Sequence, residues 1–385
     1  MACAASEILG DCLSGGVVVV KDEYLQPCEA LNPSQGLHFL ESSHPIPDIR
    51  GVEAAREIIT LLDSCQEDDL VICLMSGGGS ALLTAPVPGV SLEDLQELTR
   101  LLLACAANIY EINTLRKHLD QVKGGGLARR AHPAHLLALI LSDVVGNPLE
   151  IIASGPTVPD RSTFADAFEV LEKYQLLGRA PASIVAYLTR GMHGELPDTP
   201  KPGDAIFQRV QNVIIGSNLQ AAQAGLEQAR LEGFNSLLLT TYLQGEARQA
   251  GSTLAAIARQ IAATGHPVPP PACLIVGGET TVVVQGGGLG GRNLELALGA
   301  VEGLDGLPRL ALLTLATDGG DGPTDAAGAV VTGETLGRAR QIGLQPGVYL
   351  AQNDSYHFFQ ALGDLLITGP TLTNVNDLAF LIVFD

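Results

Sequence analysis

Apolar residues recur along this chain in two alternating patterns. In the first half, short β-branched or leucine-rich runs predict strands at residues 17–20, 70–74 and 136–141. Apolar residues at helical spacing predict helices at residues 2–13, 53–62, 92–110 and 163–174. Strands that alternate with helices are typical of an α/β fold with a mostly parallel sheet.

The second half repeats this alternation after a passage rich in proline and glycine at residues 196–204. Strands are predicted at residues 212–215, 237–240, 272–276 and 281–285, with a last one that ends at Phe384. Helices are predicted up to Leu231, at 245–264, from Arg292 onward, at 334–342 and at 356–362. We therefore expect two α/β domains, at residues 1–204 and 205–385.

Length and charge narrow the expected partners. The 385 residues exceed the size at which one core usually keeps growing. With 22 Lys and Arg against 42 Asp and Glu, the net charge is −20, which repels nucleic acid and anionic membranes. The seven cysteines show no metal-site spacing, and no signal peptide or membrane-spanning run is evident. We expect a cytoplasmic protein with small-molecule partners.

A glycine-rich turn follows the strand predicted at 70–74. It comprises Ser76, Gly77, Gly78, Gly79 and Ser80, and a helical segment follows it. Such a turn can cradle a phosphate or carboxylate with its backbone amides. The alternative is a tight turn that needs glycine for positive φ angles.

Three basic residues lie close together in the sequence of this acidic protein: Arg116, Lys117 and Lys123. They could contact an anionic substrate, or they could belong to a solvated helix face.

A second glycine cluster precedes the helix that begins at Arg292. Gly286, Gly288 and Gly291 satisfy the GxGxxG pattern of dinucleotide-binding folds. However, no acidic residue ends a second strand about 20 residues further on, as such a site requires. A nicotinamide site is thus one interpretation of this cluster.

Phosphoryl transfer is the other interpretation, and it explains more of the residues. Arg292 and the backbone amides of Gly290 and Gly291 can neutralise a transferring phosphoryl group. Asp318, Asp321 and Asp325 could hold magnesium together with phosphate oxygens. Asx turns within the local backbone are the alternative for these aspartates.

Glu279 lies on a Gly-Gly-Glu-Thr turn, where it could contact a metal or a hydroxyl or cap a helix.

Other chemistries lack their motifs. No Gly-Lys-Ser/Thr motif of a P-loop is present, and neither is a Gly-x-Ser-x-Gly elbow or an HExxH zinc motif.

A series of ordered motifs extends over nearly the whole chain. The first half contains Ser43-His-Pro-Ile-Pro-Asp48, Met75-Ser-Gly-Gly-Gly-Ser-Ala-Leu-Leu83, Asn113-Thr-Leu-Arg-Lys-His118, Lys123-Gly-Gly-Gly126, Leu141-Ser-Asp143 and Ile152-Ala-Ser-Gly-Pro-Thr157. The second half contains Gly277-Gly-Glu-Thr280, Gly290-Gly-Arg-Asn-Leu-Glu-Leu-Ala297, Thr317-Asp-Gly-Gly-Asp-Gly-Pro-Thr-Asp-Ala-Ala-Gly328, Asn353-Asp-Ser355 and Thr373-Asn-Val-Asn-Asp377. With these motifs the sequence closely resembles the glycerate 2-kinase family with a MOFRL-type C-terminal domain, some members of which are labelled hydroxypyruvate reductases.

The resemblance implies magnesium- and ATP-dependent phosphorylation of D-glycerate to 2-phosphoglycerate. It also implies a Rossmann-like N-terminal domain, a MOFRL-like region at residues 272–380, and an active site between the two domains. Arg292 matches the family's Gly-Gly-Arg-Asn arginine. The remaining candidates in these motifs are Lys117 and Asp143 for catalysis, and Asn293, Asn353, Asp354 and Asn374 for binding glycerate or ATP. A homo-oligomer is compatible with these expectations.

One family segment has no counterpart in this sequence. The family carries a catalytic lysine in a Val-Gly-Lys-Ala segment ahead of a helix that resembles residues 1–13. The lysines here are at 21, 117, 123, 173 and 201, so a substitute would come from Lys117 or Lys123. We expect either a start codon placed too late or a loss of catalysis.

Two other functions therefore stay open. A hydroxypyruvate reductase would use NAD(P)H at the GxGxxG glycines. A non-catalytic homologue would bind glycerate or nucleotide without turnover.

Overall fold

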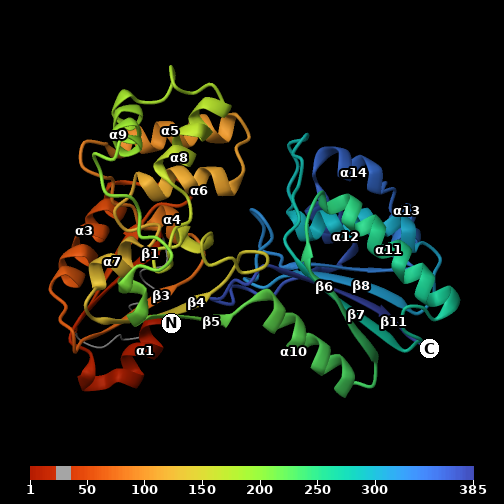
Figure 1. Cartoon of the computed structure of the whole chain (residues 1–385). Helices are drawn as coiled ribbons and strands as arrows, with labels where there is room; N and C mark the ends of the chain where they lie inside the picture. The colour runs from red at the N-terminus through yellow and green to blue at the C-terminus, as the bar shows by residue number, and fades with distance from the viewer. Residues whose placement is uncertain (23–35) are drawn as a thin grey trace. The chain divides into compact units, whose positions relative to one another are not determined.

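The computed structural model describes residues 1–22 and 36–385. These residues form two compact units (Figure 1). The first unit comprises Met1–Ile140 and Pro148–Ile215, and the second comprises Leu141–Asn147 and Gly216–Asp385. The chain passes into the second unit after Ile215, whereas the sequence places a domain boundary after residue 204.

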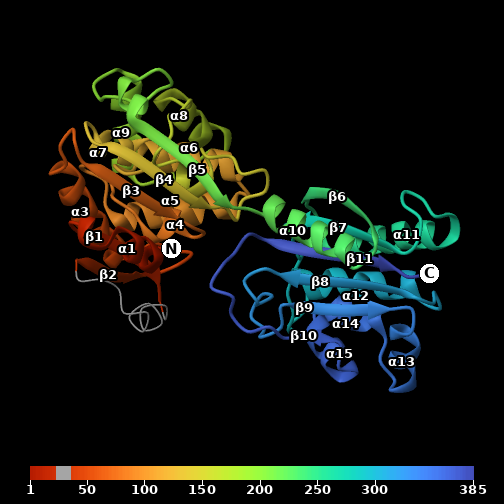
Figure 2. The same cartoon turned by 90° about the horizontal axis from the view of Figure 1, so that it is seen from below.

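The described residues of the first unit contain five strands in two sheets: β1 (Gly16–Lys21), β2 (Leu37–Ser42), β3 (Leu70–Met75), β4 (His135–Leu141) and β5 (Val210–Gly216). β1 and β2 pair in parallel. The other sheet has the order β3-β4-β5, and β3 and β4 are also parallel (Figure 2). The expected mixed α/β class with parallel strands is confirmed.

The helices of the first unit, among the described residues, are α1 (Ala2–Leu9), α3 (Ile49–Asp63), α4 (Gly79–Leu82), α5 (Leu92–Ala104), α6 (Ile109–His118), α7 (Gly126–Ala131), α8 (Phe164–Lys173) and α9 (Ala182–Met192). Short 3-10 helices lie at Gly10–Cys12, Ile152–Ser154 and Ala205–Arg209. Helices α5, α6, α8 and α9 share one hydrophobic core.

The single helix predicted at 92–110 is wrong, because two helices occupy this region. Helix α5 ends at Ala104, and Asn108 then caps a new helix by accepting a hydrogen bond from the backbone of Glu111. The Glu111 side chain accepts from the Asn108 amide in return. This capping box starts a helix in a new direction.

The second unit is built on one six-stranded sheet, with the order β10-β9-β8-β11-β7-β6. Its strands are β6 (Asn235–Leu243), β7 (Ala272–Gly278), β8 (Leu310–Ala316), β9 (Gly328–Thr332), β10 (Leu365–Leu366) and β11 (Asp377–Val383). β6 and β7 are parallel, whereas β11 runs antiparallel to both β7 and β8. The strand predicted at 281–285 is wrong: Thr281 makes only an isolated bridge with Glu246.

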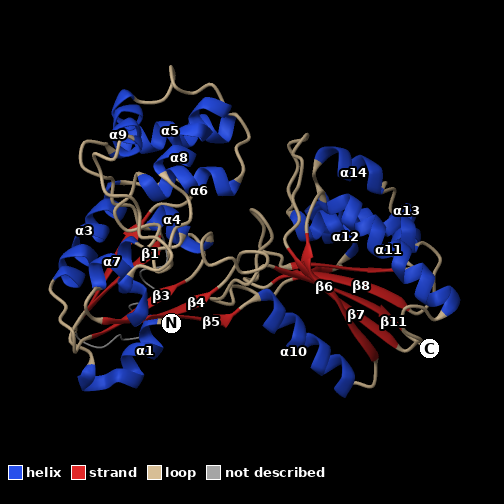
Figure 3. Ribbon diagram, in the orientation of Figure 1, coloured by secondary structure: helices blue, strands red, loops and turns tan. Residues whose placement is uncertain are grey.

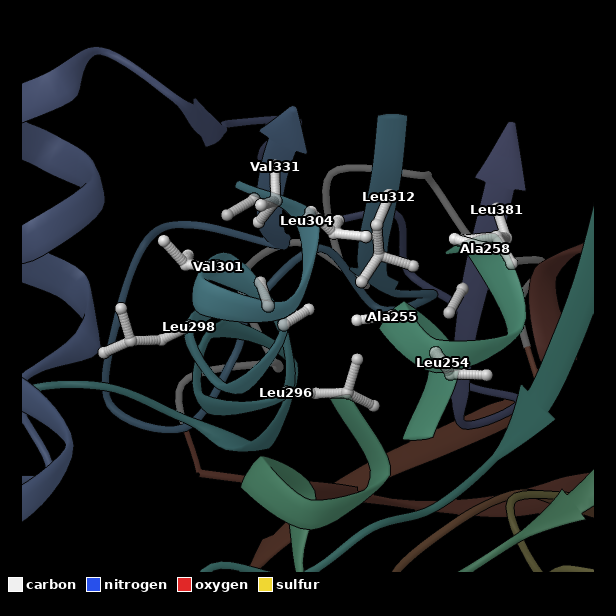
Figure 4. Close-up of a cluster of buried hydrophobic side chains, with 14 of the residues drawn as sticks. Leu254, Ala255, Ala258, Leu296, Leu298, Val301, Leu304, Leu312, Val331 and Leu381 are labelled. Atoms are coloured by element: carbon white, nitrogen blue, oxygen red, sulfur yellow. The ribbon is translucent and has the colours of Figure 1, made fainter. Parts of the chain in front are cut away.

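Helices cover both faces of this sheet (Figure 3). Helix α10 (Asn218–Leu231) packs on one face. The opposite face carries α11 (Ala247–Thr264) and α12 (Arg292–Leu304), with α13 (Thr335–Gln341), α14 (Pro346–Gln352) and α15 (Ser355–Leu362) at their side. Leucine and valine side chains from helices and strands interlock beneath them (Figure 4).

Helices α11 and α12 cross at very close range because glycines lie at their contact. A Cβ atom at Gly251 would overlap the carbonyl oxygen of Leu296, and one at Gly303 would lie 2.7 Å from the Cβ of Ala255. This contact fixes α12, and therefore its first residue, Arg292, against the sheet.

Candidate functional site

Arg292 is the first residue of α12 and the centre of a charged cluster in the second unit. Its Nε donates to Asp377 Oδ2 at 2.5 Å, and its Nη2 donates to Asp377 Oδ1 at 3.1 Å. Its Nη1 lies 3.1 Å from Glu279 Oε1. Burial lowers the pKa of Arg292, but the hydrogen bonds and charge of Asp377 outweigh burial and raise it. Arg292 is therefore a fixed, permanent cation.

Asp377 was not among the predicted site residues. It begins β11, where it lies opposite Gly278 of β7 and Ala316 of β8. Its side chain is only 11 % exposed. A carboxylate at the start of an otherwise apolar buried strand is the sequence signal that could have identified it, because such a charge needs a partner.

Glu279 and Asp143 complete the cluster, which we call the Arg292 cluster (Arg292, Asp377, Glu279 and Asp143). Burial raises the pKa of Glu279, Arg292 lowers it, and Asp377 and Asp143 raise it further. Three predicted residues, Arg292, Glu279 and Asp143, are therefore brought together. Asp143 belongs to the short segment Leu141–Asn147, which is part of the second unit.

Asp321 caps the N-terminus of α12. Its Oδ1 accepts from the backbone N–H of Asn293 at 3.1 Å and from the Asn293 side chain at 3.3 Å. Its Oδ2 accepts from the backbone N–H of Leu294 at 2.8 Å. The carboxylate is buried, and burial raises its pKa to about 6. Both oxygens predicted to bind magnesium thus already accept hydrogen bonds from the helix that carries Arg292.

The other acidic residues of this segment have separate surroundings. Asp318 Oδ1 accepts from the backbone N–H of Gly320 at 3.1 Å, which is an Asx turn. Tyr356 donates to Asp325 at 2.8 Å. No group of three or more potential metal-binding side chains occurs within the described ranges. Magnesium bound through one or two carboxylates and substrate phosphates requires no such group.

The glycine loop before α12 packs on the segment after α14. Asn353 Oδ1 accepts from the amides of Gln285 and Gly286 at 2.7 and 2.9 Å. Asp354 Oδ1 accepts from the amide of Leu289 at 2.9 Å. A Cβ at Gly288 would overlap Asp354. The glycines therefore allow close approach of two loops.

The end of this loop has free backbone donors. Within residues 1–22 and 36–385, neither the Gly290 amide nor the Gly291 amide donates a hydrogen bond. Gly291 is the N-cap of α12, so these donors lie at the positive end of the helix dipole. Asn374, by contrast, accepts from the Asn376 amide at 2.9 Å in a local turn.

The Ser76–Ser80 turn of the first unit opens the four-residue helix α4. Gly78 has φ 82°, so this position needs glycine, whereas Ser76 is exposed. The Ser80 hydroxyl lies 2.7 Å from the hydroxyl of Ser154, which in turn donates to Asn113 Oδ1 at 3.0 Å. Three segments distant in sequence therefore meet at this turn.

Lys117 and Lys123, which could substitute for the family's Val-Gly-Lys-Ala lysine, are both buried and paired with aspartates. Lys117 Nζ donates to Asp160 at 3.2 Å. Lys123 Nζ donates to Asp120 at 2.6 Å and to the Leu83 carbonyl oxygen at 2.9 Å. Burial lowers the pKa of Lys123, although Asp120 opposes this effect. Neither lysine lies on a solvated helix face.

Known protein families match parts of both units. A domain of unknown function, DUF4147, matches residues 1–189, and the MOFRL family matches residues 272–377. None of the helices in the described residues is long and apolar enough to span a membrane.

Relatives similar to this chain over most of their length include glycerate kinases. A D-glycerate 2-kinase from Thermotoga maritima is 44 % identical over 98 % of this chain and 86 % of its own length. A protein named as a putative hydroxypyruvate reductase from Agrobacterium vitis is 40 % identical over 100 % of this chain and 96 % of its own length. The crystal structure of the Thermotoga maritima glycerate kinase matches 100 % of this chain and 88 % of its own with a TM-score of 0.92. This chain belongs to the glycerate 2-kinase family.

Proposed function

We propose that this protein transfers the γ-phosphoryl group of ATP to the 2-hydroxyl of D-glycerate. The relatives named as glycerate 2-kinases support this proposal, with 44 % identity to the Thermotoga maritima enzyme over nearly the whole chain. Within the structure, the observation that carries it is Arg292, a permanent cation at a helix N-terminus beside two free backbone amides.

The proposed reaction needs neutralisation of charge more than covalent chemistry. The 2-hydroxyl oxygen forms a bond to the γ-phosphorus, the bond from that phosphorus to the bridging oxygen of ADP breaks, and the hydroxyl proton leaves to a base. Negative charge spreads over the oxygens of the transferring group. Arg292, the Gly290 amide and the Gly291 amide would stabilise those oxygens, with Asp377 holding the guanidinium in place.

The carboxylates of the Arg292 cluster would handle the hydroxyl. A carboxylate whose pKa is raised toward neutrality accepts a proton more effectively, and the pKa of Glu279 is raised mainly by burial. We assign Glu279 to hydroxyl positioning, and Asp143 and Lys117 as further candidates. The Ser76–Ser80 turn would bind a phosphate or carboxylate.

Magnesium would be held by Asp318 together with phosphate oxygens of ATP. Asp318 keeps one carboxylate oxygen for which the described residues provide no hydrogen-bond donor. When bound, the ion neutralises phosphate charge. Asp321 would contribute by fixing α12 and Asn293, and Asn353 and Asp354 by shaping the loop that presents Gly290 and Gly291.

The test is formation of 2-phosphoglycerate from D-glycerate and Mg·ATP, detected by coupling to enolase, which does not accept 3-phosphoglycerate. We expect Arg292→Ala to lower kcat by about 10²- to 10³-fold, as for loss of one transition-state donor. Arg340→Ala is the control, because Arg340 is 65 % exposed in a surface ion pair with Asp305. Full activity of Arg292→Ala would contradict the assigned role.

The reductase alternative has less support. No strand leads directly into the GxGxxG glycines, because β7 ends at Gly278, and Asn353 and Asp354 accept hydrogen bonds from amides of the loop. Oxidation of NADH that depends on hydroxypyruvate, without glycerate phosphorylation, would reverse this preference.

A further inference from the structure

A small cavity lies within the first unit, between α5, α6 and the segments that flank α4. Its wall includes Pro47, Ser80, Thr84, Arg116, Asp120 and Lys123, together with leucines of the two helices. The lining residues as a whole come from four separate segments of the sequence. The cavity therefore depends on the tertiary fold, and of the residues assigned to the proposed reaction only Ser80 lines it.

Arg116 is the unusual group in this wall. It is partly buried, and burial lowers its pKa while the charge of Asp120 raises it. Across residues 1–22 and 36–385, its guanidinium takes part in no hydrogen bond or ion pair. The partly buried guanidinium therefore keeps its donors available for a ligand that accepts hydrogen bonds from it.

The neighbouring charges leave Arg116 as the surplus cation. Lys123 is tied to Asp120 at 2.6 Å and to the Leu83 carbonyl oxygen at 2.9 Å, so this pair is neutral as a whole. One uncompensated positive charge therefore faces the cavity. A monoanion matches that charge better than a phosphate dianion does.

The shape and chemistry of the wall indicate which monoanion. The planar guanidinium pairs with a carboxylate through two parallel hydrogen bonds. Leucine side chains can pack against a short carbon skeleton, and the space is too small for a nucleotide. We propose that this cavity is a binding site for a small monocarboxylate, with Arg116 as its anchor. Resting on the proposed function, the ligand would be glycerate, held by its carboxylate.

Steady-state kinetics of Arg116→Ala test this proposal. Loss of the charge-assisted hydrogen bonds should raise the KM for D-glycerate by about 10- to 100-fold. The KM for ATP should change less than twofold, and added guanidinium ion should partly restore glycerate affinity. Arg116→Lys keeps the charge without the fork, so its KM should lie between those of the wild type and Arg116→Ala. Arg100→Ala on α5 is the matched control, since Arg100 is 58 % exposed.

An unchanged glycerate KM in Arg116→Ala would overturn the proposal, and so would an equal rise in both KM values. If the wild type does not phosphorylate glycerate, the proposed function fails, but the cavity is still tested. Ligand-observed NMR with D-glycerate and with acetate should then show binding to the wild type and not to Arg116→Ala. Equal binding to both proteins, or to neither, would refute the site.

Discussion

Replacing Asp377 by asparagine tests how the Arg292 cluster is held together. The carboxylate accepts two hydrogen bonds from Arg292, at 2.5 and 3.1 Å, and it is largely buried. Asparagine keeps one acceptor oxygen but turns an amide NH₂ toward a guanidinium N–H. One charge-assisted hydrogen bond is lost, at a cost of about 1.5–3 kcal/mol.

If this energy serves to position Arg292 in the transition state, kcat/KM for glycerate phosphorylation should fall by about 10- to 150-fold. The assay is enolase-coupled kinetics on the wild type, Asp377→Asn, Arg292→Ala and the double variant. Because Asp377 acts through Arg292, its substitution should have little further effect once Arg292 is absent. Asp305→Asn is the matched control, since it weakens an exposed ion pair with Arg340.

The pH dependence of the phosphorylation rate is a second test of Asp377→Asn. Burial raises the pKa of Glu279, and the negative charge of Asp377 raises it further. In Asp377→Asn that second contribution is removed, so the pKa of Glu279 should fall. An acidic limb of the rate profile that depends on Glu279 should move to lower pH. Activity within twofold of the wild type, or a limb that moves upward, would refute this account.

Two further predictions concern the scaffold of α12. Gly251→Ala should lower the free energy of unfolding by at least about 1–3 kcal/mol, because the added Cβ would overlap the Leu296 carbonyl oxygen. In Gly337→Ala on α13 the added Cβ meets open space, so this variant should be more stable by about 0.5–1 kcal/mol. Urea unfolding distinguishes them, and equal effects would contradict the packing argument. Asp321 has a folded pKa of about 6, against an ordinary value of 3.8, so the folded state binds more protons between these values. Its stabilising contribution is thus full below about pH 4 and is lost as pH rises through about 6. Asp321→Ala should therefore cost more stability at pH 4.5 than at pH 7.5, and the reverse order would exclude this linkage.

Much of the local structure was predictable from the sequence because it depends on nearby residues. Apolar periodicity located β3, β4 and β7, and the glycine cluster followed by an amphipathic run located the start of α12 at Arg292. The error at residues 92–110 had a local cause, the capping box at Asn108 and Glu111. The strand expected at 281–285 failed because those residues pack as a loop against Asn353.

The roles of the acidic residues depended on distant contacts. Asp321 has the appearance of a magnesium ligand in the sequence, yet its oxygens cap α12, whose residues lie 27 and 28 positions earlier in the chain. Spacing alone cannot distinguish a cap from a ligand, because either role needs only a carboxylate beside a glycine turn.

The sequence by itself determined the α/β class and the family, and it made Arg292 a candidate site residue, since each follows from local patterns and ordered motifs. The tertiary structure alone decided what surrounds that arginine. Strand β11 enters the sheet between β7 and β8 in antiparallel register, which sets Asp377 opposite Gly278 and hence next to Glu279. Asp377 lies 85 residues from Arg292 in the chain. Only strand order and register, which hydrogen bonding and burial across the whole sheet decide, bring the two charges together.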